Sequence, residues 1–214
     1  MDEKGFWGIF AKRNKIKVLK ELGKGGFGEV REIKMNGKVY AGKLVKINAK
    51  KDMGKGSFDE GEEKDNIILY LKNPNIVKIY KIYQEFDQEN PNEGYNLIIM
   101  ERAVLKDLKT FIKYLFTHNR DNIICNPFNE TVGNTFLIFL AKQIIRGLET
   151  LDRNELIHFD IKPENILIFL EISLKISDFG LLREVNNLEK IRIPGGTPGY
   201  LSPDYYKKRR SNNI

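Results

Sequence analysis

The chain has few of the residues that build disulfides and metal centres. It contains one cysteine, Cys125, and two histidines in 214 residues. A lone cysteine excludes an intrachain disulfide and argues against a metal site made of thiolates. We therefore expect Cys125 to be a small buried or half-buried side chain.

Long apolar runs are also missing. The longest are short pieces such as residues 136–141, far below the roughly 18 residues of a membrane helix. The N-terminus is too polar and charged for a signal peptide. We expect an intracellular protein with no membrane partner, located in the cytoplasm, with the nucleus as the alternative if the basic run 207–210 serves import.

The charge is positive but dispersed. The net charge is +7, from 36 Lys and Arg against 29 Asp and Glu, and only residues 207–210 form a tight basic run. We interpret most of this charge as solvated surface, which also suits a protein that handles polyphosphate. Binding to nucleic acid is a disfavoured alternative, and it would have to survive high salt to be taken seriously.

The first hundred residues have the pattern of short strands. We expect strands at 16–22, 29–35, 38–45, 76–86 and 95–101, with Asn36-Gly37 predicting a hairpin between the second and third. Residues 1–15 show no period and are expected to form a loose extension, although Phe6, Trp7 and Phe10 could dock onto another part of the protein.

Three helices are expected, one within the strand-rich first half and two after residue 104. Ser57 and Glu60 form a capping box for a helix ending near residue 72, on which Glu63 lies in line with an apolar stripe. Two more helices are expected at 105–116 and 135–151, with 118–134 as an insertion loop. The apolar residues expected on one face of the last helix are Leu137, Leu140, Ala141, Ile144, Ile145, Leu148 and Leu151.

Three glycines and a lysine suggest a phosphate site. Gly23, Gly25 and Gly28 precede Val30 in a G-x-G-x-x-G-x-V pattern, whose backbone N–H groups could approach phosphate oxygens. Taken alone the pattern could be a glycine-rich turn, and the strand expected after it disfavours a Rossmann site. Lys43, thirteen residues after Val30, could neutralise phosphates if a carboxylate fixed it. Glu63 is our candidate partner, with Glu60 or Glu62 as alternatives.

The most specific signal lies in the second half. The run H-F-D-I-K-P-E-N-I-L begins at His158, and Asp178-Phe179-Gly180 follows thirteen residues after Asn165. This ordered set resembles the catalytic domain of eukaryotic-type serine/threonine protein kinases, here C-terminally truncated. The resemblance implies an α+β, two-lobed fold. An N-lobe with an antiparallel β-sheet plus one helix would span 16–101, after the extension 1–15. A mainly helical, incomplete C-lobe would span 102–214 and end just after the activation segment.

The resemblance also implies roles. Asp160 would be the catalytic base, Lys162 would support the γ-phosphate, Asn165 and Asp178 would hold Mg²⁺, and Thr197 would bond the Asp160–Lys162 pair and line the substrate pocket. The implied cofactors are ATP and Mg²⁺, and the implied partners are proteins with Ser or Thr acceptors. The residues implied around the nucleotide, with Lys43, are Leu22, Gly23, Gly25, Gly28, Val30, Ala41, Met100, Glu101, Ala103, Asp107, Leu167 and Asp178. Plain core packing is the alternative for the apolar ones.

The chain departs from the family pattern in several places. Phe159 stands where many kinases have Arg, and residues 181–196 contain no Ser, Thr or Tyr, so we expect activity without activation-loop phosphorylation. Only ten residues follow Asp204, which replaces the family's Glu. We therefore expect exposed apolar surface between residues 108 and 151, aggregation and weak activity, or another polypeptide that covers this surface. The alternative function is a truncated ATP-binding pseudokinase or interaction module.

Overall fold

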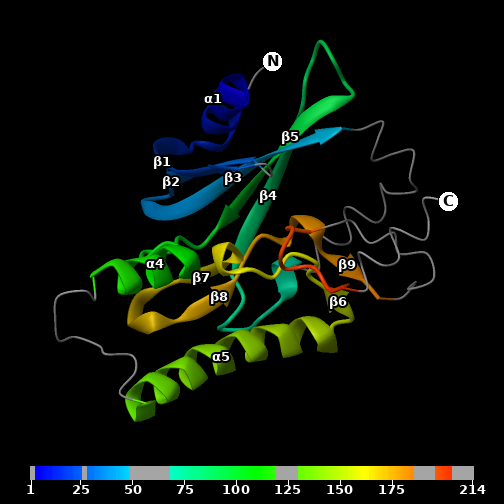
Figure 1. The fold of residues 1–214 in the computed structure, drawn as a ribbon. Coiled ribbons are helices and arrows are strands. Elements are labelled where there is room, and N and C mark those ends of the chain that lie inside the picture. The colour runs from blue at the N-terminus through cyan, green and yellow to red at the C-terminus, as the bar shows by residue number, and fades with distance from the viewer. Residues whose placement is uncertain (1–2, 26–27, 49–67, 119–129, 186–195, 204–214) are drawn as a thin grey trace. The chain divides into compact units, whose positions relative to one another are not determined.

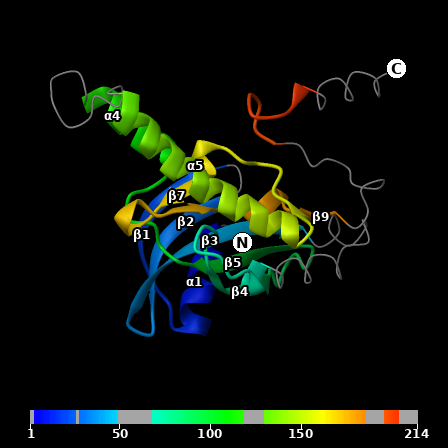
Figure 2. The ribbon, with the colours of Figure 1, turned by 90° about the horizontal axis from the view of Figure 1, so that it is seen from below.

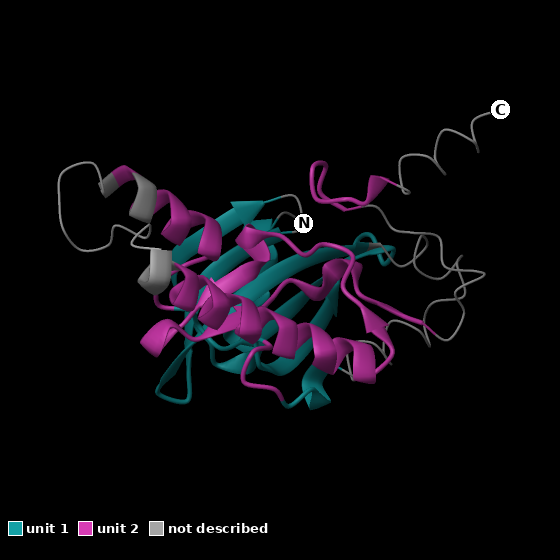
Figure 3. Ribbon diagram, turned by 60° about the horizontal axis from the view of Figure 1, so that its bottom comes forward, with its two compact units in different colours: residues 1–72, 77–103 teal, residues 73–76, 104–214 magenta. Residues whose placement is uncertain are grey.

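The structure is a computed structural model that describes residues 3–25, 28–48, 68–118, 130–185 and 196–203. The chain divides into two compact units (Figure 3). One comprises residues 1–72 and 77–103, and the other comprises residues 73–76 and 104–214.

The first unit is built on a five-stranded antiparallel sheet (Figure 1). Its strands are β1 (Lys17–Gly25), β2 (Gly28–Met35), β3 (Lys38–Asn48), β4 (Ile79–Phe86) and β5 (Glu93–Met100), in the order β1-β2-β3-β5-β4. The expected hairpin joins β2 to β3. Asn36 and Gly37 both have positive φ, 49° and 77°, as a two-residue hairpin turn that matches the strand twist requires.

The register of the strands separates two faces of this sheet. Val30 pairs directly with Lys43, and Leu44 pairs directly with Leu97. Because neighbouring residues of a strand point to opposite faces, Lys43 and Val30 share one face, and Leu44 and Leu97 share the other. The second face carries the core of this unit.

The prediction of a loose N-terminal extension is wrong. Residues Glu3–Asn14 form helix α1 (Figure 1). Its Phe6, Trp7 and Phe10 side chains are buried in one core with Leu44 and Leu97. The docking alternative for these three aromatic residues is confirmed. The apolar pattern spans little more than one helical turn, too short to reveal a period, and the helix is stabilised chiefly by burial of the three rings.

The second unit combines two helices with two short two-stranded sheets. Its elements are α4 (Leu108–His118), α5 (Glu130–Arg153), β6 (Leu156–Ile157), β7 (Ile166–Ile168), β8 (Leu174–Ile176) and β9 (Arg183–Glu184), with 3₁₀-turns at Pro163–Asn165, Leu170–Ile172 and Phe179–Leu181. β6 pairs with β9 and β7 pairs with β8. α5 packs along β7 and β8 (Figure 2). Leu140 of α5 shares a buried core with Ile166 and Ile176.

Both helix boundaries differ from the sequence prediction. α4 begins at Leu108 because the Asp107 carboxylate accepts a hydrogen bond from Thr110 N at 2.8 Å, which caps the helix. α5 begins at Glu130, so the expected loop of 118–134 is too long at both ends. α5 is apolar on more than one side: Leu140 and Leu151 are buried, whereas Leu137 and Ile145 are 61% and 52% exposed. Exposed apolar side chains therefore do occur between residues 108 and 151.

Several predictions fall outside the described residues. They concern Cys125, the capping box of Ser57 and Glu60, the carboxylates Glu62 and Glu63, Asp204, and the basic run 207–210. Of the helix expected at 57–72, residues 68–72 are described: 68–70 are helical, whereas 71 and 72 are not, so the predicted end near residue 72 is two residues too late. None of the helices within the described ranges has the length and apolar character that a membrane span needs.

Candidate active site

The glycine-rich segment forms a hairpin in which one glycine is obligatory. β1 and β2 pair up to Gly25 and Gly28. Gly28 has a φ of 121°, and a Cβ on it would overlap the carbonyl oxygen of Leu44. A Cβ on Gly23 or Gly25 would meet nothing within 4 Å, so open space lies beside the backbone there. This is room that a ligand's oxygens could use.

Lys43 lies next to the base of this hairpin. It is 9% exposed and projects from the same sheet face as Val30 and Ala41. Glu63, its predicted partner, is outside the described residues, so their ion pair stays a prediction.

Lys78, the residue before β4, binds the segment that follows β5. Glu101 N donates to Lys78 O at 3.0 Å, and Glu101 Oε1 accepts from Lys78 N at 2.6 Å. Arg102 Nη1 lies 2.5 Å from Glu32 Oε2 on β2. These contacts fix the backbone between Met100 and Ala103.

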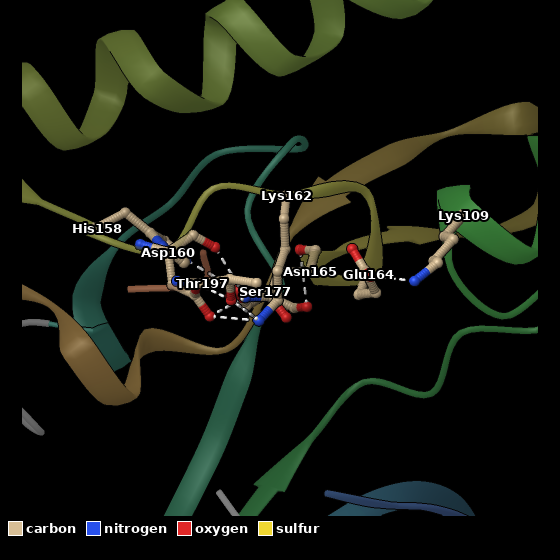
Figure 4. A network of polar contacts seen from close by, with 8 residues as sticks. All are labelled: Lys109, His158, Asp160, Lys162, Glu164, Asn165, Ser177 and Thr197. Carbon is tan, nitrogen blue, oxygen red and sulfur yellow. Dashed lines mark hydrogen bonds and ion pairs between the residues drawn. The ribbon is translucent and has the colours of Figure 1, made fainter. Parts of the chain in front are cut away.

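In the second unit, Asp160 is the centre of a polar network (Figure 4). Its Oδ2 accepts from Lys162 Nζ at 2.7 Å and from Asn165 Nδ2 at 3.0 Å. Its Oδ1 accepts from Thr197 N at 3.1 Å and Thr197 Oγ1 at 2.7 Å. Burial raises the pKa of the Asp160 carboxyl, but the bonds from Lys162, Thr197 and Asn165 outweigh it and hold this pKa below its usual value. Asp160 is therefore ionised at neutral pH.

Thr197 joins the 196–203 segment to this network. Its hydroxyl accepts from Lys162 Nζ at 2.6 Å while it donates to Asp160. The preceding Gly196 has a φ of 151°, and a Cβ there would lie 2.8 Å from the Phe159 carbonyl oxygen. Glycine thus allows the 196–203 segment to come close to the loop that carries Phe159 and Asp160.

From the sequence we assigned no role to His158 or Ser177. Both residues position the loop 158–165, which carries Asp160 and Asn165. His158 Nε2 lies 2.9 Å from Ser177 O, and His158 Nδ1 lies 3.2 Å from Asp160 N. A carbonyl only accepts, so Nε2 carries the proton and Nδ1 accepts from Asp160 N–H. Ser177 N and Oγ both donate to Asn165 O, at 2.8 and 2.9 Å. A sequence signal for their role did exist, because His158 begins the H-x-D motif and Ser177 directly precedes D-F-G.

Asn165 and Asp178 offer oxygen ligands. Asn165 is 5% exposed, and its Nδ2 also donates to Asp160 O at 2.8 Å, which leaves Oδ1 as the side-chain atom suited to a cation. Asp178 has a left-handed backbone, with φ 62° and ψ 70°, a strained conformation for a non-glycine residue that occurs often at functional sites and also in turns. The described residues contain no group of three or more His, Cys, Asp or Glu side chains that could hold a metal ion by themselves. Mg²⁺ commonly takes one or two protein carboxylates with water and phosphate, so this pair fits it.

The predicted site residues thus fall on both units. The first unit carries Leu22, Gly23, Gly25, Gly28, Val30, Ala41, Lys43, Met100, Glu101 and Ala103. The second carries Asp107, Asp160, Lys162, Asn165, Leu167, Asp178 and Thr197. Asp107 and Leu167 form an isolated antiparallel bridge, while the Asp107 carboxylate caps α4. The meeting of the two groups in one cleft stays a prediction.

Known proteins are similar to this chain over most of its length. A family model described as protein kinase domain matches residues 16–213. The chain is 34% identical over 200 residues to Calcium-dependent protein kinase 6 of Plasmodium berghei, covering 92% of this chain and 12% of that protein. It is 31% identical over 199 residues to Calcium/calmodulin-dependent protein kinase type II of Caenorhabditis elegans, covering 89% and 24%. It is 31% identical over 211 residues to Serine/threonine-protein kinase cds1 of Schizosaccharomyces pombe, covering 95% and 41%.

The chain spans 12% to 41% of the length of these three relatives. The family match includes the glycine hairpin, Lys43 and the Asp160 network, and it extends over nearly the whole chain. The five-stranded antiparallel sheet followed by the helical unit is the fold that this match implies. The chain therefore belongs to the protein kinase family.

Proposed function

We propose that the chain is a protein serine/threonine kinase, which transfers the γ-phosphate of Mg-ATP to Ser or Thr hydroxyls of proteins. The observation that carries the proposal is the network in which Lys162, Asn165 and Thr197 all donate to the Asp160 carboxylate. Three of these four residues come from one ten-residue segment, and Thr197 comes from a segment more than thirty residues further along the chain.

Asp160 orients the acceptor hydroxyl. Its carboxylate is ionised at neutral pH, so it accepts the hydroxyl's hydrogen bond and takes the proton as the new oxygen–phosphorus bond forms and the bond to the ADP oxygen breaks. Lys162 places a positive charge beside Asp160, where it can offset charge on the γ-phosphate oxygens. Thr197 holds both side chains in this geometry.

Asn165 Oδ1 and the Asp178 carboxylate are proposed to hold Mg²⁺. When bound, the metal neutralises phosphate charge and favours an in-line arrangement of the reacting oxygens. His158 and Ser177 fix the backbone that carries Asn165. Asp178 lies between β8 and the following 3₁₀-turn, and its left-handed backbone sets the direction in which its carboxylate leaves the chain.

The nucleotide is proposed to lie against the glycine hairpin of the first unit. Lys43 would neutralise the α- and β-phosphates, with Glu63 as its partner. The Glu101 N–H is bonded to Lys78, so we assign the Glu101 carbonyl and the Ala103 backbone to adenine. The proposed apolar contacts to the base are Leu22, Val30, Ala41 and Leu167, next to Met100, with Asp107 near the ribose. Cytoplasmic location is proposed as well.

A second function is favoured by the exposed apolar side of α5. Leu137, Ile138 and Ile145 are 61%, 53% and 52% exposed, which suits a nucleotide-binding interaction module with little turnover that binds a partner through this side.

Two paired measurements separate these functions: the melting temperature with and without Mg-ATP, and phosphate transfer to a generic Ser/Thr protein substrate. A kinase gives a rise in melting temperature and turnover. A rise without turnover supports the module, and no rise at all contradicts nucleotide binding.

A further inference from the structure

α1 contacts the glycine-rich hairpin at one defined place. The two strands of the hairpin pair Lys24 directly with Glu29, so these side chains share the sheet face that α1 covers. Lys24 Nζ lies 2.7 Å from Glu3 Oε2, and Trp7 Nε1 donates to Glu29 Oε2 at 2.7 Å. Glu3 and Trp7 are four residues apart and therefore neighbours on one side of the helix. A neighbouring pair on α1 thus binds a cross-strand pair on the hairpin.

The Trp7–Glu29 contact is the stronger of the two links. Trp7 and Glu29 are each 4% exposed, whereas the Lys24 and Glu3 side chains are 58% and 36% exposed, where solvent weakens an ion pair. Arg31 completes the group: its Nε and Nη2 donate to Glu29 Oε1 at 3.0 and 2.7 Å, and its guanidinium lies 5.7 Å from the Trp7 ring centre. Both carboxylate oxygens of Glu29 are therefore bonded.

Glu29 is ionised at neutral pH. The bonds from Arg31 lower the pKa of its carboxyl, burial opposes this, and the Trp7 bond lowers the pKa further. A buried carboxylate that lost Trp7 as a donor would be left with an unsatisfied oxygen, which is costlier than loss of an ordinary hydrogen bond.

The position of Glu29 gives this contact its consequence. Glu29 lies between Gly28 and Val30, on the opposite face from Val30 and Lys43. We infer that Trp7 and Glu29 are a positioning pair, through which α1 holds the glycine-rich hairpin in the conformation that receives the nucleotide phosphates. The consequence for nucleotide rests on the proposed function, whereas the mechanical link between α1 and the hairpin does not.

The link is tested by amide hydrogen exchange of the nucleotide-free protein. Trp7→Phe keeps an aromatic ring in the core and removes the donor. We expect exchange at residues 23–25 and 28–30 to rise roughly tenfold, with residues 93–100 of β5 unchanged. Phe10→Leu is the matched control, because Phe10 is buried in the same core. It should raise exchange in the hairpin and β5 together. The inference is overturned if Trp7→Phe leaves the hairpin unchanged or behaves as Phe10→Leu does.

Glu29→Gln tests the same contact from the hairpin side, and it decides the matter if Trp7→Phe does not fold. It should also raise exchange selectively in the hairpin; equal exchange to wild type overturns the inference.

A kinetic experiment with ATP as the varied substrate tests the consequence for nucleotide. Trp7→Phe should raise KM for ATP about tenfold with kcat within about twofold, whereas Phe10→Leu should reduce only the active fraction. Selective exchange without any ATP binding by the wild type would refute the proposed function and leave the link standing.

Discussion

His158 and Ser177 are joined by a hydrogen bond of 2.9 Å from the imidazole Nε2 to the backbone carbonyl. The other imidazole nitrogen, Nδ1, accepts from Asp160 N–H, so the neutral ring bridges the catalytic loop and the strand end before Asp178. Protonation of Nδ1 would replace this acceptor with a donor facing a donor.

This geometry predicts a pH dependence of stability. Burial lowers the pKa of His158 below 6.5, partly opposed by the Ser177 bond and by Asp178 and Asp160. The unfolded chain therefore binds a proton at higher pH than the folded chain does. The contribution of His158 to stability should be complete above about pH 6.5 and fall as the pH drops toward its folded pKa, by at most about 1.4 kcal/mol per pH unit. Urea unfolding from pH 5 to 8 measures this contribution. A His158→Gln variant whose free energy of unfolding has the same slope against pH as that of the wild type would contradict the prediction.

Thr197 should be needed for its hydroxyl. Thr197→Ala removes one donor to Asp160 and the acceptor of Lys162, at an expected cost of about 1–3 kcal/mol in the free energy of unfolding. Turnover should fall as well, because Asp160 and Lys162 lose a shared partner. Thr197→Ser keeps the hydroxyl and should retain most of both quantities. Equal stability and turnover in the Ala and Ser variants would show that the hydroxyl does not matter.

The hairpin glycines should differ in tolerance. Gly28→Ala meets the Leu44 carbonyl and an unfavourable φ, so we expect it to cost about 1–3 kcal/mol or more. Gly25→Ala adds a methyl group in open space and should change thermal stability little. Melting temperatures of the two variants without nucleotide give the comparison. Equal losses would argue against this hairpin conformation.

Much of the fold could be predicted because short-range signals decided it. Asn36-Gly37 specifies its turn by backbone geometry alone, and the H-x-D and D-F-G motifs fixed where the polar network would lie. α1 could not be predicted, because three aromatic residues reveal a helix only when a sheet is present to bury them. The start of α4 depends on the Asp107 cap, a local signal at a residue that had been assigned only to the surroundings of the nucleotide. The Trp7–Glu29 bond needs the register of β1 and β2 as well as the helix.

Activity should not depend on phosphorylation of the activation loop. Residues 181–196 contain no Ser, Thr or Tyr, and Phe159 has no charge with which to bind a phosphate. We expect phosphatase treatment to leave turnover unchanged, with a kinase known to require loop phosphate as the positive control. Loss of turnover together with a phosphate mapped within 181–196 would overturn this expectation.

The central claim is that the Asp160 network performs phosphate transfer. The most direct test is transfer of label from γ-labelled ATP to a Ser/Thr protein substrate by the wild type, Asp160→Asn and Asp152→Asn, a control at an exposed carboxylate on α5. We predict transfer by the wild type and by Asp152→Asn, and a loss of roughly 10²–10⁴-fold in Asp160→Asn with Mg-ATP binding retained. Equal transfer by the wild type and Asp160→Asn would contradict the account.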